Sequence, residues 1–329
     1  TELTSSGALG ASVTLSNIGA GVGFRATGDM GVVNVLTLAQ AAAGAITISM
    51  DMDETVTSPA TTVAGDFDAS IVASNATSIK ADFDNDYVGV VQAAGDNTND
   101  LNITGTKATS LEIVSGGDNA INSLDYTGGN DATVGKGDLL TSVTISGAQA
   151  IDFDYTAADF SEITSVNASG LTGALTFNTA DLKAESAANA FDGGKLTLGS
   201  GDDVITMVQG AVVANIEKGS AENLAIQSGF DVFDFGGALD QAADVASTGT
   251  YNIANGKLSF EGAGPGTLAA AITLVDGAVA GAGTAVVFEY LGDSYIFVQD
   301  VADIVVKLDD VTGLGGLDQL GATGDLYLI

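Results

Sequence analysis

The chain has 329 residues, of which 46% are hydrophobic, 44 are glycine and only two are proline. Its 42 acidic and nine basic side chains give a formal net charge of −33. This charge argues against nucleic acid as a partner, because few cations are present to neutralise phosphates. Histidine, cysteine and tryptophan are absent, so zinc fingers and catalytic centres built on Cys or His are excluded. No run of about 18 apolar residues predicts a transmembrane helix.

The first segment, residues 1–75, is predicted to be a separate N-terminal β region. Its strand-like pieces are VTLSNIG, NVLTLAQ and AITISMDMDE, in which apolar and polar residues alternate. No proline-rich linker separates it from the next segment. The opening TELTSSGALG lacks a basic start and a continuous apolar core, so we expect it not to be a signal peptide.

A short repeat marks the second segment, residues 76–209. Triplets of Thr, Ser and an apolar residue begin at positions 77, 109, 141 and 164. Their spacings are 109 − 77 = 32, 141 − 109 = 32 and 164 − 141 = 23 residues. A unit of strand and turn that is too small to bury its own apolar face must stack on its neighbours. We therefore predict an irregular parallel β-solenoid, or β-roll, for this segment.

Three glycine-rich turns in this segment carry acidic or amide side chains, in SGGDNAI (115–121), TGGNDAT (127–133) and GSGDDVI (199–205). Glycine permits backbone conformations that are closed to other residues, and Ca²⁺ takes carboxylate and carbonyl oxygens. The turns match part of the nonapeptide G-G-x-G-x-D-x-U-x, which binds Ca²⁺ in β-rolls. They are not in tandem, so three plain turns with solvated acids are the alternative. The candidate ligands are Gly117, Asp118, Asn119, Gly129, Asn130, Asp131, Gly199, Gly201, Asp202 and Asp203.

A further acidic cluster, Asp82, Asp84 and Asp86, alternates along ADFDNDY. On a strand these side chains would share one face and repel each other. In a loop they could wrap a cation, as the first half of an EF-hand loop does. The closing glutamate of an EF-hand is missing, so a solvated acidic face is the simpler interpretation. The three residues remain further candidate Ca²⁺ ligands.

The third segment, residues 210–329, is predicted to be a C-terminal β-rich domain for assembly or secretion, with a small α+β part. The expected short helices are 221–226, 238–246 and 268–275, and the expected hairpins are 250–262 and 285–300. A further strand is expected in IVVKLDDV and a closing one in the last five residues. For the whole chain we predict an all-β fold, in which the solenoid is flanked by β-sandwich-like parts.

Three stretches together resemble bacterial S-layer and S-layer-like proteins of the RTX group, which are secreted by type I systems. They are ITSVNASGLTGALTF (163–177), LTLGSGDDVITM (196–207) and FEYLGDSYIFVQDVADIVVKLDDVTGL (288–314). The resemblance covers roughly residues 105–329, and composition alone carries it in the first third. It implies a non-enzymatic protein on the outside of the cell, held together by Ca²⁺ and assembling into a lattice. It also implies a C-terminal secretion region.

The predicted function is therefore structural: a secreted cell-surface protein that folds with Ca²⁺ and self-assembles. Its partners would be further copies of itself, with a cell-surface polysaccharide as another candidate. An RTX-type adhesin or matrix filament is the alternative, since the same phrases occur in large RTX adhesins. A third alternative is the non-catalytic secretion domain of an enzyme. We expect this chain itself to have no enzymatic activity.

Overall fold

The computed structural model describes residues 2–5, 10–27, 30–51, 54–55, 67–84, 87–88, 98–117, 121–129, 138–157, 161–186, 190–218, 229–237, 239–320 and 325–329. The chain divides into two compact units, Thr1–Phe177 (unit 1) and Asn178–Ile329 (unit 2). Within the described ranges, no helix has both the length and the apolar character needed to cross a membrane.

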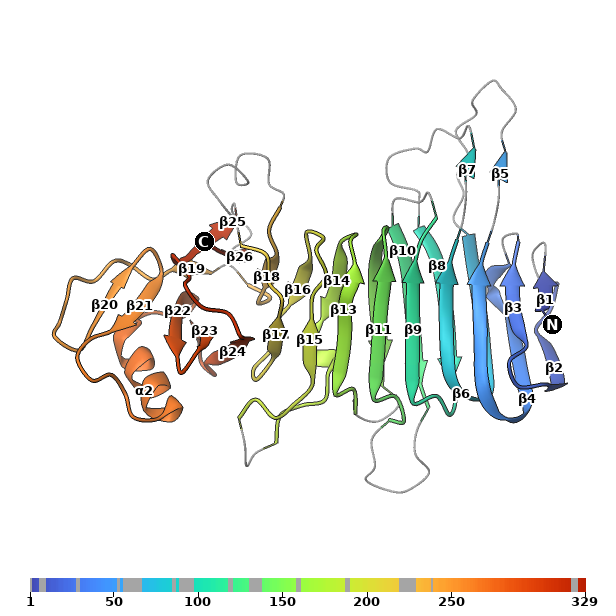
Figure 1. Cartoon of the computed structure of the whole chain (residues 1–329), viewed down its shortest axis with the longest axis horizontal. Coiled ribbons are helices and arrows are strands. Elements are labelled where there is room, and N and C mark those ends of the chain that lie inside the picture. The colour runs from blue at the N-terminus through green and yellow to red at the C-terminus, as the bar shows by residue number, and fades with distance from the viewer. Residues whose placement is uncertain are drawn as a thin grey trace. The chain divides into compact units, whose positions relative to one another are not determined.

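Unit 1 consists of two rows of parallel strands, in which strands from distant parts of the sequence lie side by side (Figure 1). The first row contains β2 (Val13–Ile18), the early part of β4 (Gly31–Met50), the early part of β6 (Phe67–Phe83), β8 (Thr98–Gly105), β10 (Ile121–Gly128), β12 (Ala150–Thr156) and β14 (Leu175–Asn178). The second row contains β1 (Glu2–Ser5), β3 (Gly23–Ala26), the later parts of β4 and β6, β9 (Ser110–Ser115), β11 (Ser142–Gly147) and β13 (Ser165–Leu171). A short parallel pair, β5 (Glu54–Thr55) and β7 (Tyr87–Val88), lies apart from both rows. In a two-sided coil, each turn of the chain contributes one strand to each row. Strands of successive turns then pair in parallel, as they do here.

The Thr-Ser-apolar triplets occupy the same position on successive strands of the second row. Their serines align in the order Ser78, Ser110, Ser142 and Ser165. The threonine before each of the last three serines donates its backbone N–H and its hydroxyl to the carbonyl of the preceding threonine, at 2.9–3.2 Å. The repeat that the sequence predicts from spacings of 32, 32 and 23 residues is therefore confirmed as a ladder of stacked corners.

Replacing Thr141 by valine tests this ladder, because valine keeps the shape of threonine and removes only the hydroxyl that donates to the Thr109 carbonyl at 3.1 Å. We expect the free energy of unfolding to fall by about 0.5–1 kcal/mol, the usual net value of one hydrogen bond. Urea denaturation provides the measurement. The matched control is Thr144→Val, at an exposed position of β11, the strand that follows Thr141. An equal loss of stability in both variants would argue against the ladder.

The core of unit 1 lies between the two rows and is continuous along them. Alternate residues of each strand point inward, so equivalent positions form columns. One column contains Leu36, Ile71, Ile103, Tyr126 and Tyr155, which align in successive strands and are 1–6% exposed. The alternation of apolar and polar residues thus buries one side of strands such as β9 and β12, and the all-β prediction is confirmed.

Unit 2 begins with the 3₁₀ turn η1 (Thr179–Asp181) and two further pairs of short parallel strands. β15 (Lys195–Thr197) pairs with β17 (Val212–Ala214), and β16 (Val204–Thr206) pairs with β18 (Val232–Asp234). Two later strands cover these pairs. β24 (Ile304–Asp309) lies parallel to β17, and β26 (Asp325–Leu328) lies antiparallel to β18.

The remainder of unit 2 is the small α+β part. It contains β19 (Asp240–Gln241), the hairpin β20 (Tyr251–Ala254) and β21 (Lys257–Phe260), the helix α2 (Leu268–Ala278), the hairpin β22 (Thr284–Tyr290) and β23 (Asp293–Gln299), and β25 (Leu317–Leu320). Ala271 and Val275 of α2 pack in one core with Phe288 and Phe297. Both hairpins, the helix that begins after Thr267, the IVVKLDDV strand and the closing strand are where the sequence predicts them.

One predicted helix is wrong. Residues 240 and 241, inside the expected helix 238–246, form β19 and pair in parallel with β22. The backbone N–H groups of Asp240 and Ala242 donate to the carbonyls of Gly283 and Ala285, so pairing with a distant strand overrides the local helical preference. The expected helix 221–226 lies outside the described residues.

Each predicted segment boundary lies inside one of the two units. Residues 75 and 76 lie inside β6, whose two parts belong to different rows. Residues 209 and 210 lie between β16 and β17. The strands of residues 1–75 pair in register with later strands of the stack, so they share the core of unit 1.

Candidate functional site

The turn from β15 to β16 contains the predicted motif Gly199–Asp203. Gly199, Gly201 and Asp203 are buried in this turn, whereas Asp202 is exposed. Asp203 is 0% exposed. The Asp202 carboxylate accepts the backbone N–H of Gly229 at 2.7 Å. The two adjacent acids therefore serve different purposes, since Asp202 fastens a neighbouring loop while Asp203 turns into the protein.

Asp203 lies against a second buried acid, Asp231, which precedes β18 and is also 0% exposed. The Asp231 carboxylate accepts the N–H of Asp203 at 3.2 Å and that of Glu217 at 2.7 Å. The Asp203 carbonyl in turn accepts the N–H of Val232 at 2.8 Å. Two consecutive turns of the stack thus bring two buried carboxyl groups together, and we call Asp203 and Asp231 the carboxylate pair.

The carboxylate pair is electrostatically unfavourable. Burial, together with the charges of Asp203 and Glu217, raises the pKa of Asp231 from 3.8 to about 8, although two backbone N–H groups oppose the change. At neutral pH the pair therefore requires a counter-charge, which either a proton or a metal ion can supply.

Asn215 limits where a metal ion could lie at this turn. It has a left-handed backbone (φ 62°), and its Nδ2 donates to the carbonyls of Leu198 at 2.8 Å and Gly199 at 3.0 Å. These carbonyls of the glycine turn are thereby engaged by an amide. A cation at this turn would therefore take its charged ligands from the carboxylate pair and would share these carbonyls with the amide.

The donors of the carboxylate pair match Ca²⁺ in kind, because Ca²⁺ prefers hard oxygen ligands. Ca²⁺ takes about six to eight such ligands, and among the described residues no three acidic side chains gather closely enough to enclose a metal ion. Backbone carbonyls and water would therefore have to complete the coordination shell around the two carboxylates.

The other predicted ligands lie in unit 1. Gly117 has φ 82°, and its carbonyl accepts the Gln149 amide at 2.7 Å. At Gly129 a Cβ atom would lie 2.2 Å from the Thr106 carbonyl oxygen, so the close approach of two turns requires glycine there. Outside the described residues lie Asp86, Asp118, Asn119, Asn130 and Asp131.

The alternating acids at the end of β6 have separate surroundings. Asp82 forms an ion pair with Lys80 at 3.0 Å. Asp84 is exposed, and its backbone N–H donates to the Met50 carbonyl at 2.8 Å. Lys80 therefore pairs with the first of these acids and the second is exposed to solvent, and a cation site in this cluster stays a prediction.

Sequence reasoning missed an acidic surface on the outer side of the first row. Asp125 aligns with Asp154, and Ser123 aligns with Asp100 on one side and Asp152 on the other. Adjacent strands lie about 4.8 Å apart. Partial burial and the neighbouring aspartates raise the pKa values of Asp125 and Asp152. Aligning DLNIT, SLDYT and DFDYT by their repeat would have revealed these columns.

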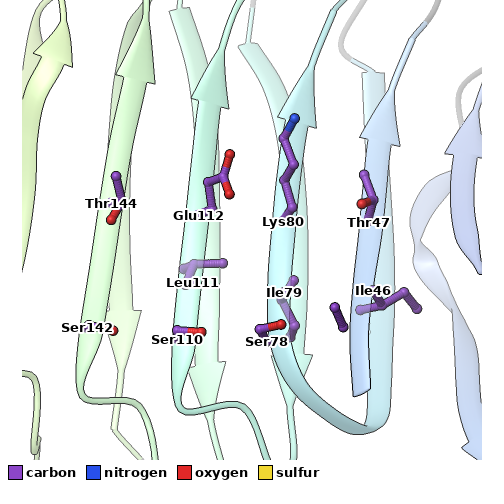
Figure 2. Close-up of a pocket in the computed structure, with 11 residues that line it drawn as sticks. Ile46, Thr47, Ser78, Ile79, Lys80, Ser110, Leu111, Glu112, Ser142 and Thr144 are labelled. Carbon is purple, nitrogen blue, oxygen red and sulfur yellow. The ribbon is translucent and has the colours of Figure 1, made fainter. Parts of the chain in front are cut away.

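A groove of about 420 Å³ crosses the second row and is lined by both polar and apolar residues. Figure 2 shows Ser78, Ser110 and Ser142 in line across neighbouring strands, with Lys80 and Glu112 beside each other along the groove. Thr47 and Thr144 contribute further hydroxyl groups, and no aromatic side chain lines the groove. The groove can offer hydrogen bonds to an extended polar chain, without the aromatic ring on which a sugar would stack.

Comparison with protein-family models, with curated proteins and with solved structures found no match to this chain.

Proposed function

We propose that this chain is a structural, non-enzymatic protein of the cell surface, which is secreted, folds with Ca²⁺ and assembles with further copies into an S-layer-type lattice. The observation that carries the proposal is the carboxylate pair, in which two consecutive turns of a parallel stack bury Asp203 against Asp231. The partial match of the turn at Gly199–Asp203 to an RTX-type motif in the sequence supports the same site.

Linkage between ion binding and folding gives this arrangement a physical purpose. An ion that binds only the folded state stabilises it by mass action. Extracellular calcium modules bind at about 10⁻⁴ to 10⁻³ M, so such a site would stay empty inside a cell and fill outside it. The acidic columns of the first row add to the effect, because closely spaced carboxylates attract cations and repel each other in their absence.

Thermal unfolding followed by circular dichroism tests this proposal. We expect the full chain to have a higher Tm in millimolar Ca²⁺ than in a chelator. Asp203→Asn should remove part of that difference, because it removes one carboxylate of the pair. Asp240→Asn changes an exposed acid of the same unit and should leave the difference unchanged. The same Tm for the unmodified chain in Ca²⁺ and in chelator would refute the linkage.

The groove across the second row favours a second candidate function, an RTX-type adhesin or matrix filament that binds a cell-surface polysaccharide. Its aligned hydroxyl groups run across the strands, and hydroxyl-rich polymers match them in chemistry. Electron microscopy separates the two functions. Sheets or tubes that form only with Ca²⁺ would favour the lattice, whereas a monomer that binds isolated surface glycan and forms no array would favour the adhesin.

A further inference from the structure

One face of the sheet formed by β22, β23 and β24 changes from apolar to polar along its strands. Phe288, Tyr295 and Val305 belong to the core that α2 also enters. Side chains two residues further along a strand point to the same side, so Tyr290 and Lys307 continue this face beyond the core, and both are half-buried. Tyr295 aligns with Phe288 in one neighbouring strand and with Lys307 in the other. It therefore lies where the core ends and polar side chains begin.

Aromatic rings surround Tyr295. Its ring stacks on that of Phe288, with the centroids 5.2 Å apart, and meets the ring of Phe191 edge to face at 5.6 Å. Phe191 comes from the loop before β15 and is half-buried. Tyr290 is near enough for its hydroxyl to act electrostatically on that of Tyr295. Two partly exposed rings, Phe191 and Tyr290, therefore lie beside a buried one.

Ion pairs border the same tyrosine. The Lys307 ammonium nitrogen lies 3.0 Å from an oxygen of Asp293 and 2.6 Å from an oxygen of Asp309. The second oxygen of Asp309 lies 2.6 Å from the ammonium nitrogen of Lys195. The charges of Asp293, Lys307 and Asp309 all act on the Tyr295 hydroxyl. Each of these three side chains already contacts an opposite charge, so a further ion has little to gain here.

The Tyr295 hydroxyl is the group in this cluster that lacks a partner. Tyr295 is 4% exposed, and no residue in the described ranges forms a hydrogen bond with its hydroxyl. Burial raises the pKa of Tyr295, and the charge of Asp293 raises it further, so at neutral pH the hydroxyl keeps its proton and can donate. Buried polar groups are nearly always hydrogen-bonded. The partner of this hydroxyl should therefore be a molecule that reaches it from the solvent.

We propose that this part of unit 2, the aromatic patch, binds an uncharged hexopyranose unit of a polysaccharide. The patch consists of Phe191, Tyr290, Asp293, Tyr295, Lys307 and Asp309. Rings combined with a few fixed polar groups are typical of ligand sites. A hexopyranose has an apolar C–H face that can pack against an aromatic ring, and its hydroxyl groups both donate and accept hydrogen bonds.

The polar groups of the aromatic patch match such a sugar. The Tyr295 hydroxyl can donate to one sugar oxygen. Lys307 has three N–H donors, of which two face Asp293 and Asp309, so the third can serve another sugar oxygen. The two carboxylates can accept from sugar hydroxyl groups. This site goes beyond the proposed assembly with Ca²⁺, and it is separate from the groove across the second row, which belongs to unit 1.

Saturation-transfer difference NMR of the full chain in millimolar Ca²⁺ tests the aromatic patch, with the methyl glycosides of glucose, galactose and mannose as probes. We expect at least one glycoside to bind with a millimolar Kd. Tyr295→Phe keeps the ring and removes only the hydroxyl, so it should raise that Kd about fivefold, the effect of about one hydrogen bond. Tyr251→Phe is the matched control, because Tyr251 is a half-buried tyrosine packed on the same core, and it should leave the Kd unchanged.

Two further variants keep the test decisive. Tyr290→Ala removes a partly exposed ring and should raise the Kd severalfold, even if Tyr295→Phe folds poorly. Ser110→Ala changes the groove of unit 1 and should have no effect. Absence of saturation transfer to all three glycosides, unchanged Kd values in both patch variants, or a Kd raised only by Ser110→Ala would overturn the proposal. Because the effect of Ca²⁺ on Tm is measured separately, each of these results would leave the proposed link between Ca²⁺ and folding standing.

Discussion

In calcium-free buffer, the protein should lose stability as the pH rises from about 4 to about 8. The folded state raises the pKa of Asp231 from 3.8 to about 8, so over this range it binds a proton that the unfolded chain has released. Stability therefore falls with rising pH until both states are deprotonated. The interval of about 4 units corresponds to at most about 6 kcal/mol, at about 1.4 kcal/mol per unit.

Urea denaturation at about pH 5 and about pH 8.5, in a chelator, measures the effect. Asp231→Asn cannot ionise and should show a smaller decrease between the two conditions. Asp240→Asn removes one charge from the surface and should keep the full decrease, which separates the carboxylate pair from the general repulsion of a −33 chain. If the Asp231 and Asp240 variants lose the same stability between the two pH values, Asp231 is not the source.

Replacing Gly147 by alanine should destabilise unit 1 by about 3–5 kcal/mol, the sum of backbone strain and overpacking. Gly147 ends β11 with φ 123°, and a Cβ atom there would lie 2.0 Å from the Ser115 carbonyl oxygen of the neighbouring turn. The turn would have to move away from its neighbour. This movement would weaken the hydrogen bond that the Gly147 carbonyl accepts from the Thr172 N–H at 2.8 Å.

Gly21→Ala provides the comparison, because Gly21 also has a positive φ, 76°, but a Cβ atom there would meet nothing within 4 Å. Its expected cost is about 1–2 kcal/mol from the backbone conformation alone. Chemical denaturation of both variants measures the difference. Similar losses for Gly147→Ala and Gly21→Ala would show that the close contact between stacked turns contributes little.

The sequence predicts the repeat of unit 1 well where a residue's role is local and recurs. The Thr-Ser-apolar triplets mark the corners because the threonine hydroxyl and the inward apolar residue are both needed at every level of the ladder. No triplet occurs in residues 1–75, so the continuity of those strands with the stack was missed. Their pairing depends on partners tens of residues away, which local patterns do not specify.

The sequence indicates only one of the two residues of the carboxylate pair. The glycine turn identifies Asp203, whereas its partner Asp231 lies in the predicted C-terminal segment and matches no glycine-rich motif considered there. A signal was present: GDDVI at 201–205 and GFDVF at 229–233 share glycine, aspartate and valine at the same places, 28 residues apart. The strands confirm this register, since Val204 aligns with Val232 and Ile205 with Phe233. Burial of the pair could not be predicted, because it depends on how closely two turns stack.

The unequal spacing of the triplets has a practical consequence. From residue 109 to 141 the chain uses 32 residues, and from 141 to 164 it uses 23, a difference of 32 − 23 = 9, yet Ser142 aligns with both Ser110 and Ser165. The length of chain between corners is therefore independent of the alignment of the strands. Such a scaffold should accept foreign peptides of different lengths between its strands, which makes it suitable for displaying epitopes or tags at regular intervals.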